Sequence, residues 1–179
     1  MQQYPQDSKD FKTQILKAKA TEPEAIVVNP QTETSGATLV KQLRELGISL
    51  PMYGTFVFSA PNALTIGGSA LERILFTDAP AVPKESSRGK TLLDHYLKTS
   101  GGKPPAHELL VVLRYESVQI LKDAIENTKS LDSDSIKNFM TGMEYEGIAG
   151  TYRFNEKGDA VGIPFTVKTI KNGKVELVQ

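Results

Sequence analysis

The last third of the chain carries two hairpin signals, which constrain the fold more than any other feature. One lies at residues 155–159, and the other is the Lys-Asn-Gly-Lys run at 171–174, between alternating apolar residues. Asn-Gly is the strongest short-range hairpin cue, because the tight turn needs positive φ at both central positions. We therefore predict an antiparallel ending on a chain whose earlier part alternates strand and helix.

The composition excludes several classes of protein. The 179 residues can build one buried core or one lobe of a larger protein. Lys plus Arg and Asp plus Glu both number 21, so no basic surface points to nucleic acid. Cysteine is absent and there are two histidines, which argues against disulfides and against a metal site. The chain shows neither a membrane-spanning apolar stretch nor, at residues 1–8, the features of a secretory signal, so direct membrane insertion is not expected.

Short apolar runs alternate with amphipathic segments over the first two thirds of the chain. The runs at 25–28, 51–54 and 73–77 are predicted strands, and the first suits a strand buried on both faces of a parallel sheet. The helix that follows it is expected to be capped by Thr34 or Ser35. Later helices are predicted to begin at Ser86 or Ser87, near Ala106, and at Asp132 or Ser133. The predicted fold class is α/β, a partial doubly wound parallel sheet with C-terminal antiparallel hairpins.

No arrangement of residues predicts catalysis. The Arg-Gly-Lys-Thr run at 88–91 resembles the end of a phosphate loop, but that signature needs a glycine where Lys84 stands. His95 and His107 have no neighbouring serine and acid that would form a triad. We therefore expect no catalytic residue, no metal, no cofactor and no enzymatic activity. Glu72 and Asp78, which flank the third predicted strand, are interpreted as lone surface charges.

Four stretches, in this order along the chain, resemble type I periplasmic binding proteins. The resemblance is strongest to the leucine/isoleucine/valine-binding subfamily of ABC transporter receptors, and it covers only the C-terminal half of those proteins. The stretches are residues 10–28 (DFKTQILK, then EPEAIVV), 46–54 (LGISLPMYG), 115–121 (YESVQIL) and 147–159 (GIAGTYRFNEKGD).

The resemblance implies a division of the chain between two lobes that close on a small solute. Residues 1–85 would be an α/β segment of the second lobe. Residues 86–143 would be a helical segment of the first lobe, and residues 144–179 the hinge return and C-terminal hairpins of the second. The chain would then be a truncated protein, a proteolytic remnant, or a half that completes itself by pairing. Unpaired sheet edges and uncovered apolar faces associate, so we expect a homo-oligomer.

The predicted ligand-binding residues are Thr32, Glu33, Thr55, Phe56 and Leu110. Four of them follow the first two strands, and in open α/β sheets ligands sit beyond the carboxyl ends of strands. By the resemblance, Thr32 packs on the ligand and Leu110 belongs to an apolar wall from the other lobe. Glu33 would receive a cationic group. The alternatives are helix-core packing for Leu110 and a solvated loop acid for Glu33.

Phe56 departs from the family pattern. By the resemblance, it lies where amino-acid binders place a carboxylate for the ammonium group of the ligand. Phenylalanine offers neither a charge nor a hydrogen-bond acceptor. This favours an aromatic or less polar solute, unless Phe56 and Phe58 simply pack under a loop.

The function implied is that of an extracytoplasmic solute-binding component of an ABC importer. It would bind a small amino-acid-like, aromatic or apolar solute in an interlobe cleft, in the periplasm or outside the cell. Its other partner, through the full-length protein, would be the membrane permease. The alternatives are a ligand-sensing regulatory domain of the same fold that controls a protein partner, and, less favoured, an enzyme of the doubly wound class.

Overall fold

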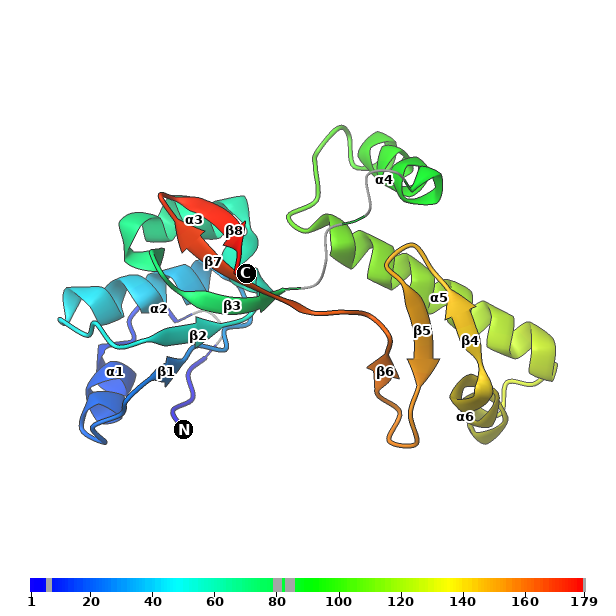
Figure 1. The fold of residues 1–179 in the computed structure, drawn as a ribbon, viewed down its shortest axis with the longest axis horizontal. Helices are drawn as coiled ribbons and strands as arrows, with labels where there is room; N and C mark the ends of the chain where they lie inside the picture. The colour runs from blue at the N-terminus through cyan, green and yellow to red at the C-terminus, as the bar shows by residue number, and fades with distance from the viewer. Residues whose placement is uncertain (6–7, 79–81, 83–85, 179) are drawn as a thin grey trace. The chain divides into compact units, whose positions relative to one another are not determined.

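The computed structural model describes residues 1–5, 8–78, 82 and 86–178, and they form two compact units. Unit 1 comprises Met1–Asp78 and Phe165–Gln179, and unit 2 comprises Ala79–Pro164 (Figure 1). The predicted α/β class, with parallel strands and an antiparallel ending, is confirmed.

Unit 1 is built on a five-stranded sheet with the order β1-β2-β3-β7-β8. The first three strands run parallel, and β7 pairs antiparallel with β3. Asn172 and Gly173 join β7 to β8 with φ values of 52° and 71°, which confirms the second predicted hairpin. The strands are β1 (Ile26–Val27), β2 (Met52–Gly54), β3 (Leu75–Asp78), β7 (Thr166–Lys171) and β8 (Lys174–Leu177).

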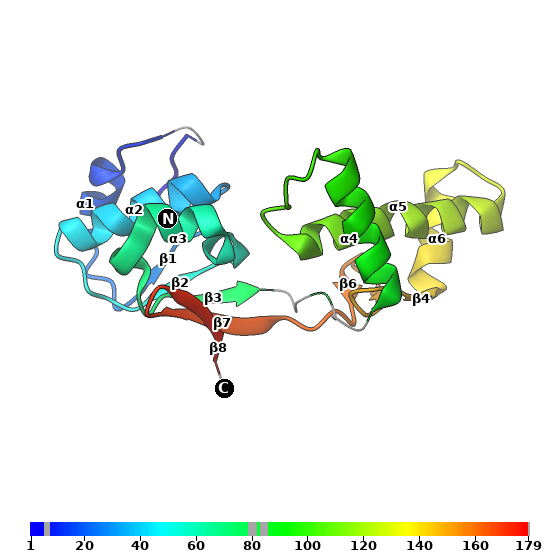
Figure 2. The ribbon, with the colours of Figure 1, turned by 90° about the horizontal axis from the view of Figure 1, so that it is seen from above.

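The helices of unit 1 cover one face of this sheet (Figure 2). They are α1 (Lys12–Lys19), α2 (Glu33–Glu45), α3 (Pro61–Gly67) and the 3-10 helices η1 (Phe56–Ser59) and η2 (Gly68–Leu71). Val28, Met52 and Phe76 point into the core beneath them. On the opposite face Val27 is 76% exposed, so the prediction that the first strand is buried on both faces is wrong. The reason is that the described residues supply helices to only one side.

Two acids at the ends of β3 hold the C-terminal hairpin in place. The Glu72 carboxylate accepts hydrogen bonds from the backbone N–H groups of Asn172 and Gly173, at 3.0 and 2.6 Å. Asp78 Oδ2 lies 2.9 Å from Lys168 Nζ, and both side chains are largely buried. Their interpretation as lone surface charges is therefore wrong. Each finds its partner about 90 or more residues along the chain, beyond the reach of a local pattern.

Unit 2 packs three helices with a three-stranded antiparallel sheet of order β4-β5-β6. The Ser86 and Asp132 side chains cap α4 and α6 by accepting from Gly89 N and Ser135 N, which confirms these predicted starts. None of the described helices is long and apolar enough to cross a membrane. The elements are α4 (Ser87–Thr99), α5 (Glu108–Thr128), α6 (Ser133–Gly142), β4 (Glu144–Glu146), β5 (Thr151–Phe154) and β6 (Ala160–Val161).

The two units can be set beside the predicted segments. The resemblance places residues 144–179 in the second lobe together with residues 1–85, and the structure divides residues 144–179 between its units at Pro164. Residues 144–164 pack with the helices of unit 2, and residues from Phe165 onward join the sheet of unit 1. The first predicted hairpin, between β5 and β6, therefore lies in unit 2. The assignment of either unit to a lobe stays a prediction.

A buried carboxylate joins α5 to the loop between β4 and β5. Glu116 is fully buried, and its side chain accepts hydrogen bonds from the backbone N–H groups of Ile148 and Ala149. It also accepts from the Tyr152 hydroxyl at 2.6 Å. A Cβ at Gly147 would overlap this carboxylate, so glycine permits the close approach. The loop is thus fixed to the middle of the helix by three donors to one side chain.

This cluster predicts a loss of stability at alkaline pH. Burial and the adjacent Glu116 raise the pKa of Tyr152 above its ordinary value, which is about 10. A raised pKa in the folded state adds stability that is present below pH 10 and is lost as the pH rises further. We expect Tyr152→Phe, compared with wild type by urea unfolding between pH 8 and 11, to lose less stability across that range. An identical pH dependence for the two proteins would contradict this expectation.

Candidate ligand-binding edge

The carboxyl ends of β1 and β2 lie side by side in unit 1. The two strands are parallel, with Ile26 opposite Met52 and Val27 opposite Tyr53. The segments that follow them therefore leave the sheet at one edge, which we call the strand-end edge. The structure places four of the predicted ligand-binding residues there, and they are Thr32, Glu33, Thr55 and Phe56.

Thr32 caps helix α2 at this edge. Its Oγ1 accepts a hydrogen bond from Ser35 N at 3.1 Å, and the buried Ser35 hydroxyl donates back to the Thr32 carbonyl at 3.1 Å. The prediction that Thr34 or Ser35 caps this helix is therefore wrong, because the cap lies two to three residues earlier, at Thr32. Thr32 thus stabilises the start of α2, whether or not it also contacts a ligand.

Glu33 and Asn62 add polar groups to the strand-end edge. Glu33 is half-buried in the first turn of α2, where the helix dipole favours a negative charge. Asn62, in the first turn of α3, donates a hydrogen bond to Thr34 Oγ1 at 3.2 Å and so joins the first turns of α2 and α3. The sequence analysis missed Asn62, since no local signal shows that two helix starts 28 residues apart meet.

Phe56 and Phe58, both in η1, have different environments. Phe58 is fully buried, and its ring lies 6.3 Å from that of Phe76, centroid to centroid. Phe56 is 37% exposed, and its carbonyl accepts from Ser59 Oγ at 2.7 Å. The half-buried Thr55 directly precedes it. The alternative that both phenylalanines pack under a loop therefore holds for Phe58 only. Phe56 remains partly exposed at the strand-end edge.

Two hollows lie in unit 2, and no predicted site residue lines either of them. One has a volume of about 560 Å³ between the end of α5, α6 and β4, and the other about 480 Å³ beside α4. Among the described residues, no group of three or more His, Asp or Glu side chains could hold a metal ion. The chemistry at the strand-end edge is therefore that of hydroxyls, one amide, one carboxylate and an aromatic ring.

Comparison with known proteins identifies the family. The model of the periplasmic binding protein family matches residues 1–174. The chain belongs to the periplasmic binding protein family. The resemblance drawn from the sequence, to its branched-chain amino acid members, is confirmed by the relatives described next.

Relatives of this periplasmic binding protein chain include Leu/Ile/Val-binding protein homolog 3 of Brucella melitensis. It is 25% identical over 169 residues, which are 93% of this chain and 44% of that protein. A leucine-binding protein from Thermotoga maritima is 28% identical with a TM-score of 0.71, over 98% of this chain and 49% of that one. A Streptococcus pneumoniae branched-chain amino acid binding protein, solved with isoleucine, is 24% identical with a TM-score of 0.64, over 98% and 50%. The chain thus spans about half the length of the relatives it matches.

The predicted ligand-binding set is divided between the two units of this binding-protein chain. Leu110 lies in the first turn of α5 in unit 2, half-buried, with its N–H donating to the His107 carbonyl at 3.2 Å. The other four residues belong to unit 1. That all five residues contact one solute stays a prediction.

Proposed function

We propose that this chain supplies one side of the solute-binding cleft of an extracytoplasmic receptor for an ABC importer. Membership of the periplasmic binding protein family supports the class of function. We propose, with support from the same membership, that the whole protein lies in the periplasm or outside the cell and has the membrane permease as a partner. The solute we propose is small and aromatic or apolar, and a carboxylate is its only amino-acid-like group.

The observation that carries this proposal is the part-exposed Phe56 ring at the strand-end edge. Phe56 provides apolar and π surface where a charge would be needed to hold an ammonium group. Thr32 and Thr55 flank it on the two neighbouring strand ends, and both are half-buried. Such an edge can pack on a flat apolar group, with polar atoms nearby to orient it. Closure of a second surface over the solute would complete the site.

The test uses the chain by itself, which should bind weakly because a cleft draws affinity from both of its sides. We expect phenylacetate, added at millimolar concentration, to shift the NMR signals of Thr32, Thr55 and Phe56 more than L-leucine does. Phe56→Glu introduces a partner for the ammonium group of the amino acid. A charge-assisted hydrogen bond of about 1.5 kcal/mol would tighten L-leucine binding roughly tenfold and weaken phenylacetate binding.

The matched control is Leu177→Glu, which places the same charge on another exposed apolar residue of unit 1, on strand β8. This variant should bind both compounds as the wild type does. Signal shifts of equal size for the two compounds, or shifts confined to unit 2, would contradict the proposed solute class. The absence of any shift at the three residues would contradict the proposed site.

A further inference from the structure

The turn between β7 and β8 contains the only Asn-Gly pair of the sequence, Asn172 and Gly173. An asparagine followed by glycine can cyclise, because the backbone nitrogen of the glycine can attack the side-chain carbonyl carbon of the asparagine. Glycine has no Cβ to hinder that approach. Both residues are exposed, so this turn combines the reactive pair with access to water.

The reaction needs only the two residues and water. A bond forms between Gly173 N and Asn172 Cγ, the bond from Cγ to Nδ2 breaks, and ammonia leaves with the proton that Gly173 N gives up. Water then opens the cyclic imide at either of its carbonyls, which yields aspartate or isoaspartate. The attacking group is the deprotonated nitrogen, so any contact that disfavours a negative charge on Gly173 N slows the reaction.

The carboxylate of Glu72 makes such a contact. It accepts hydrogen bonds from Gly173 N at 2.6 Å and from Asn172 N at 3.0 Å. The hydrogen bond stabilises the protonated nitrogen, and the adjacent negative charge disfavours a second one, so both effects oppose deprotonation. A carboxylate is also too weak a base to remove a backbone amide proton itself. Glu72 is therefore expected to protect the pair.

The backbone around Glu72 keeps this carboxylate beside the turn. Glu72 N donates to Ser69 O at 3.2 Å, and Arg73 N donates to Ile170 O at 2.9 Å, which joins the start of β3 to the end of β7. The next residue, Ile74, is fully buried, as is Ile170. The contact between Glu72 and the turn thus lasts as long as β7 stays paired with β3.

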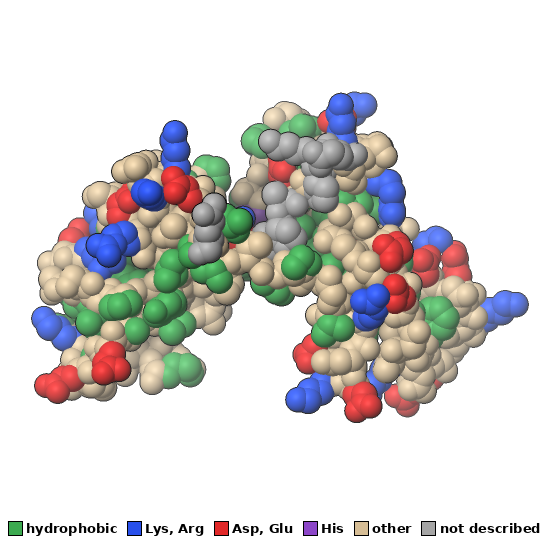
Figure 3. Space-filling view, viewed as in Figure 1, with side chains coloured by type: hydrophobic (Ala, Val, Ile, Leu, Met, Phe, Trp, Pro, Cys, Tyr) green, Lys and Arg blue, Asp and Glu red, His purple; other side chains and the backbone are tan. Residues whose placement is uncertain are grey.

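The conformation of the turn and its charges also bear on the reaction. Asn172 and Gly173 are held at φ values of 52° and 71° between the paired residues Lys171 and Lys174, and ring closure requires this backbone to rotate. The two lysines act against protection, because a nearby positive charge favours an anionic nitrogen. Figure 3 shows acidic and basic side chains intermixed over the part of unit 1 where Figure 1 places the tip of this hairpin. The charge balance at the turn therefore depends on Glu72.

We propose that Asn172 is a site of spontaneous deamidation and that Glu72 limits its rate in the folded chain. The aspartate product places a second carboxylate next to Glu72, and the isoaspartate product lengthens the main chain inside the turn by one carbon. Either product weakens the contact between the hairpin and the start of β3. This inference rests on the geometry of the turn, and not on the proposed function.

The experiment incubates the full chain at mildly alkaline pH and follows deamidation by mass spectrometry. The fragment 157–176, released by a protease that cuts after glutamate, contains Asn172 as its only asparagine. We expect the folded chain to react roughly tenfold more slowly than the chain in concentrated guanidinium chloride, because ring closure must wait for the turn to open.

The decisive variant is Glu72→Gln, which keeps an acceptor oxygen and removes the charge. In the folded chain it should react roughly fivefold faster than the wild type, since the repulsion between two neighbouring charges is lost. The matched control is Glu24→Gln, an exposed acid before β1 at the other edge of the same sheet. The control should react at the wild-type rate.

Three outcomes would overturn the proposal. Equal rates for Glu72→Gln and the wild type would show that the carboxylate does not protect Asn172. A slower rate in Glu72→Gln would show that Glu72 promotes the reaction as a base. A faster rate accompanied by faster hydrogen exchange at Ile170 and Val175, which face each other in the β7–β8 ladder, would assign the gain to loss of the hairpin. Unchanged exchange there assigns it to the lost contact with Glu72.

Discussion

Replacing Glu116 with alanine is expected to destabilise unit 2 by about 3–5 kcal/mol, because removal of one partner from a buried, charge-assisted cluster leaves the others unpaired. Two backbone N–H groups, of Ile148 and Ala149, and the Tyr152 hydroxyl would lose their acceptor at once. All of these groups are buried. Urea unfolding measured by circular dichroism gives the free energy, and hydrogen exchange locates the loss in α5 and in the 147–152 segment.

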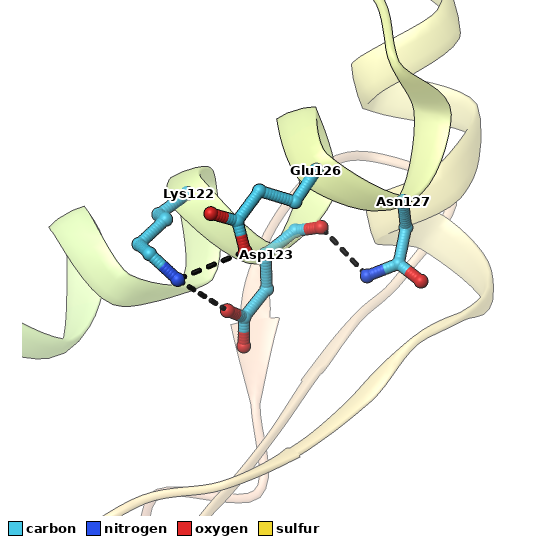
Figure 4. A network of polar contacts seen from close by, with 4 residues as sticks. All are labelled: Lys122, Asp123, Glu126 and Asn127. Atoms are coloured by element: carbon cyan, nitrogen blue, oxygen red, sulfur yellow. Dashed lines mark hydrogen bonds and ion pairs between the residues drawn. The ribbon is translucent and has the colours of Figure 1, made fainter.

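The control is Glu126→Ala on the same helix. Figure 4 shows Glu126 in a surface network, where Lys122 Nζ lies 2.9 Å from its Oε2 and 4.0 Å from Asp123 Oδ1. Asn127 Nδ2 donates to the Asp123 carbonyl at 2.8 Å in the same view. Exposed ion pairs of this kind contribute little, so this variant should unfold nearly as the wild type does. Equal losses for the two variants would refute the role given to Glu116.

Phe58→Ala is expected to cost about 3–5 kcal/mol in unit 1, the range found when a buried phenylalanine is truncated in a core. The fully buried ring packs against the ring of Phe76 and occupies the space in which a side chain at Gly54 would stand. It therefore ties η1 to the end of β2 and to β3. Loss of the ring should also loosen Thr55 and Phe56, which begin the same segment.

Phe58→Leu is the conservative comparison, and it should recover most of the stability because it refills part of the cavity. Hydrogen exchange should show the Phe58→Ala effect at residues 52–60 and leave the Glu116 cluster of unit 2 unchanged. In this way each of the two core variants serves as the control for the other. A Phe58→Ala protein with wild-type exchange at residues 52–60 would show that the ring does not organise the strand-end edge.

The local elements of the fold follow from short stretches of sequence. Asn172 and Gly173 specify a hairpin because the turn needs positive φ at both positions, and the structure has it. Ser86 and Asp132 specify helix starts because each side chain accepts from an N–H three residues ahead. Four stretches of residues, in the same order along the chain as in the family, were also enough to indicate the family, which the family model confirms.

The candidate site was predictable only in part. The carboxyl ends of β1 and β2 were located correctly, because the segments that follow two neighbouring parallel strands leave the sheet at the same end. That Thr32 caps α2, and that Phe58 is buried while Phe56 is part-exposed, depended on packing around the loops. Whether any of these residues contacts a solute stays a prediction.

The sequence by itself determined the second hairpin turn, the starts of α4 and α6, the class of fold and the family, because these depend on backbone preferences and patterns within a few residues. Only the tertiary structure decided that Glu116 binds a loop 32 residues away, that Asp78 pairs with Lys168, and that residues 144–164 join unit 2. It also decided which side of the unit 1 sheet the described helices cover. The physical reason is that a buried polar group takes whichever partner the packed chain brings to it, and that choice leaves no local signal.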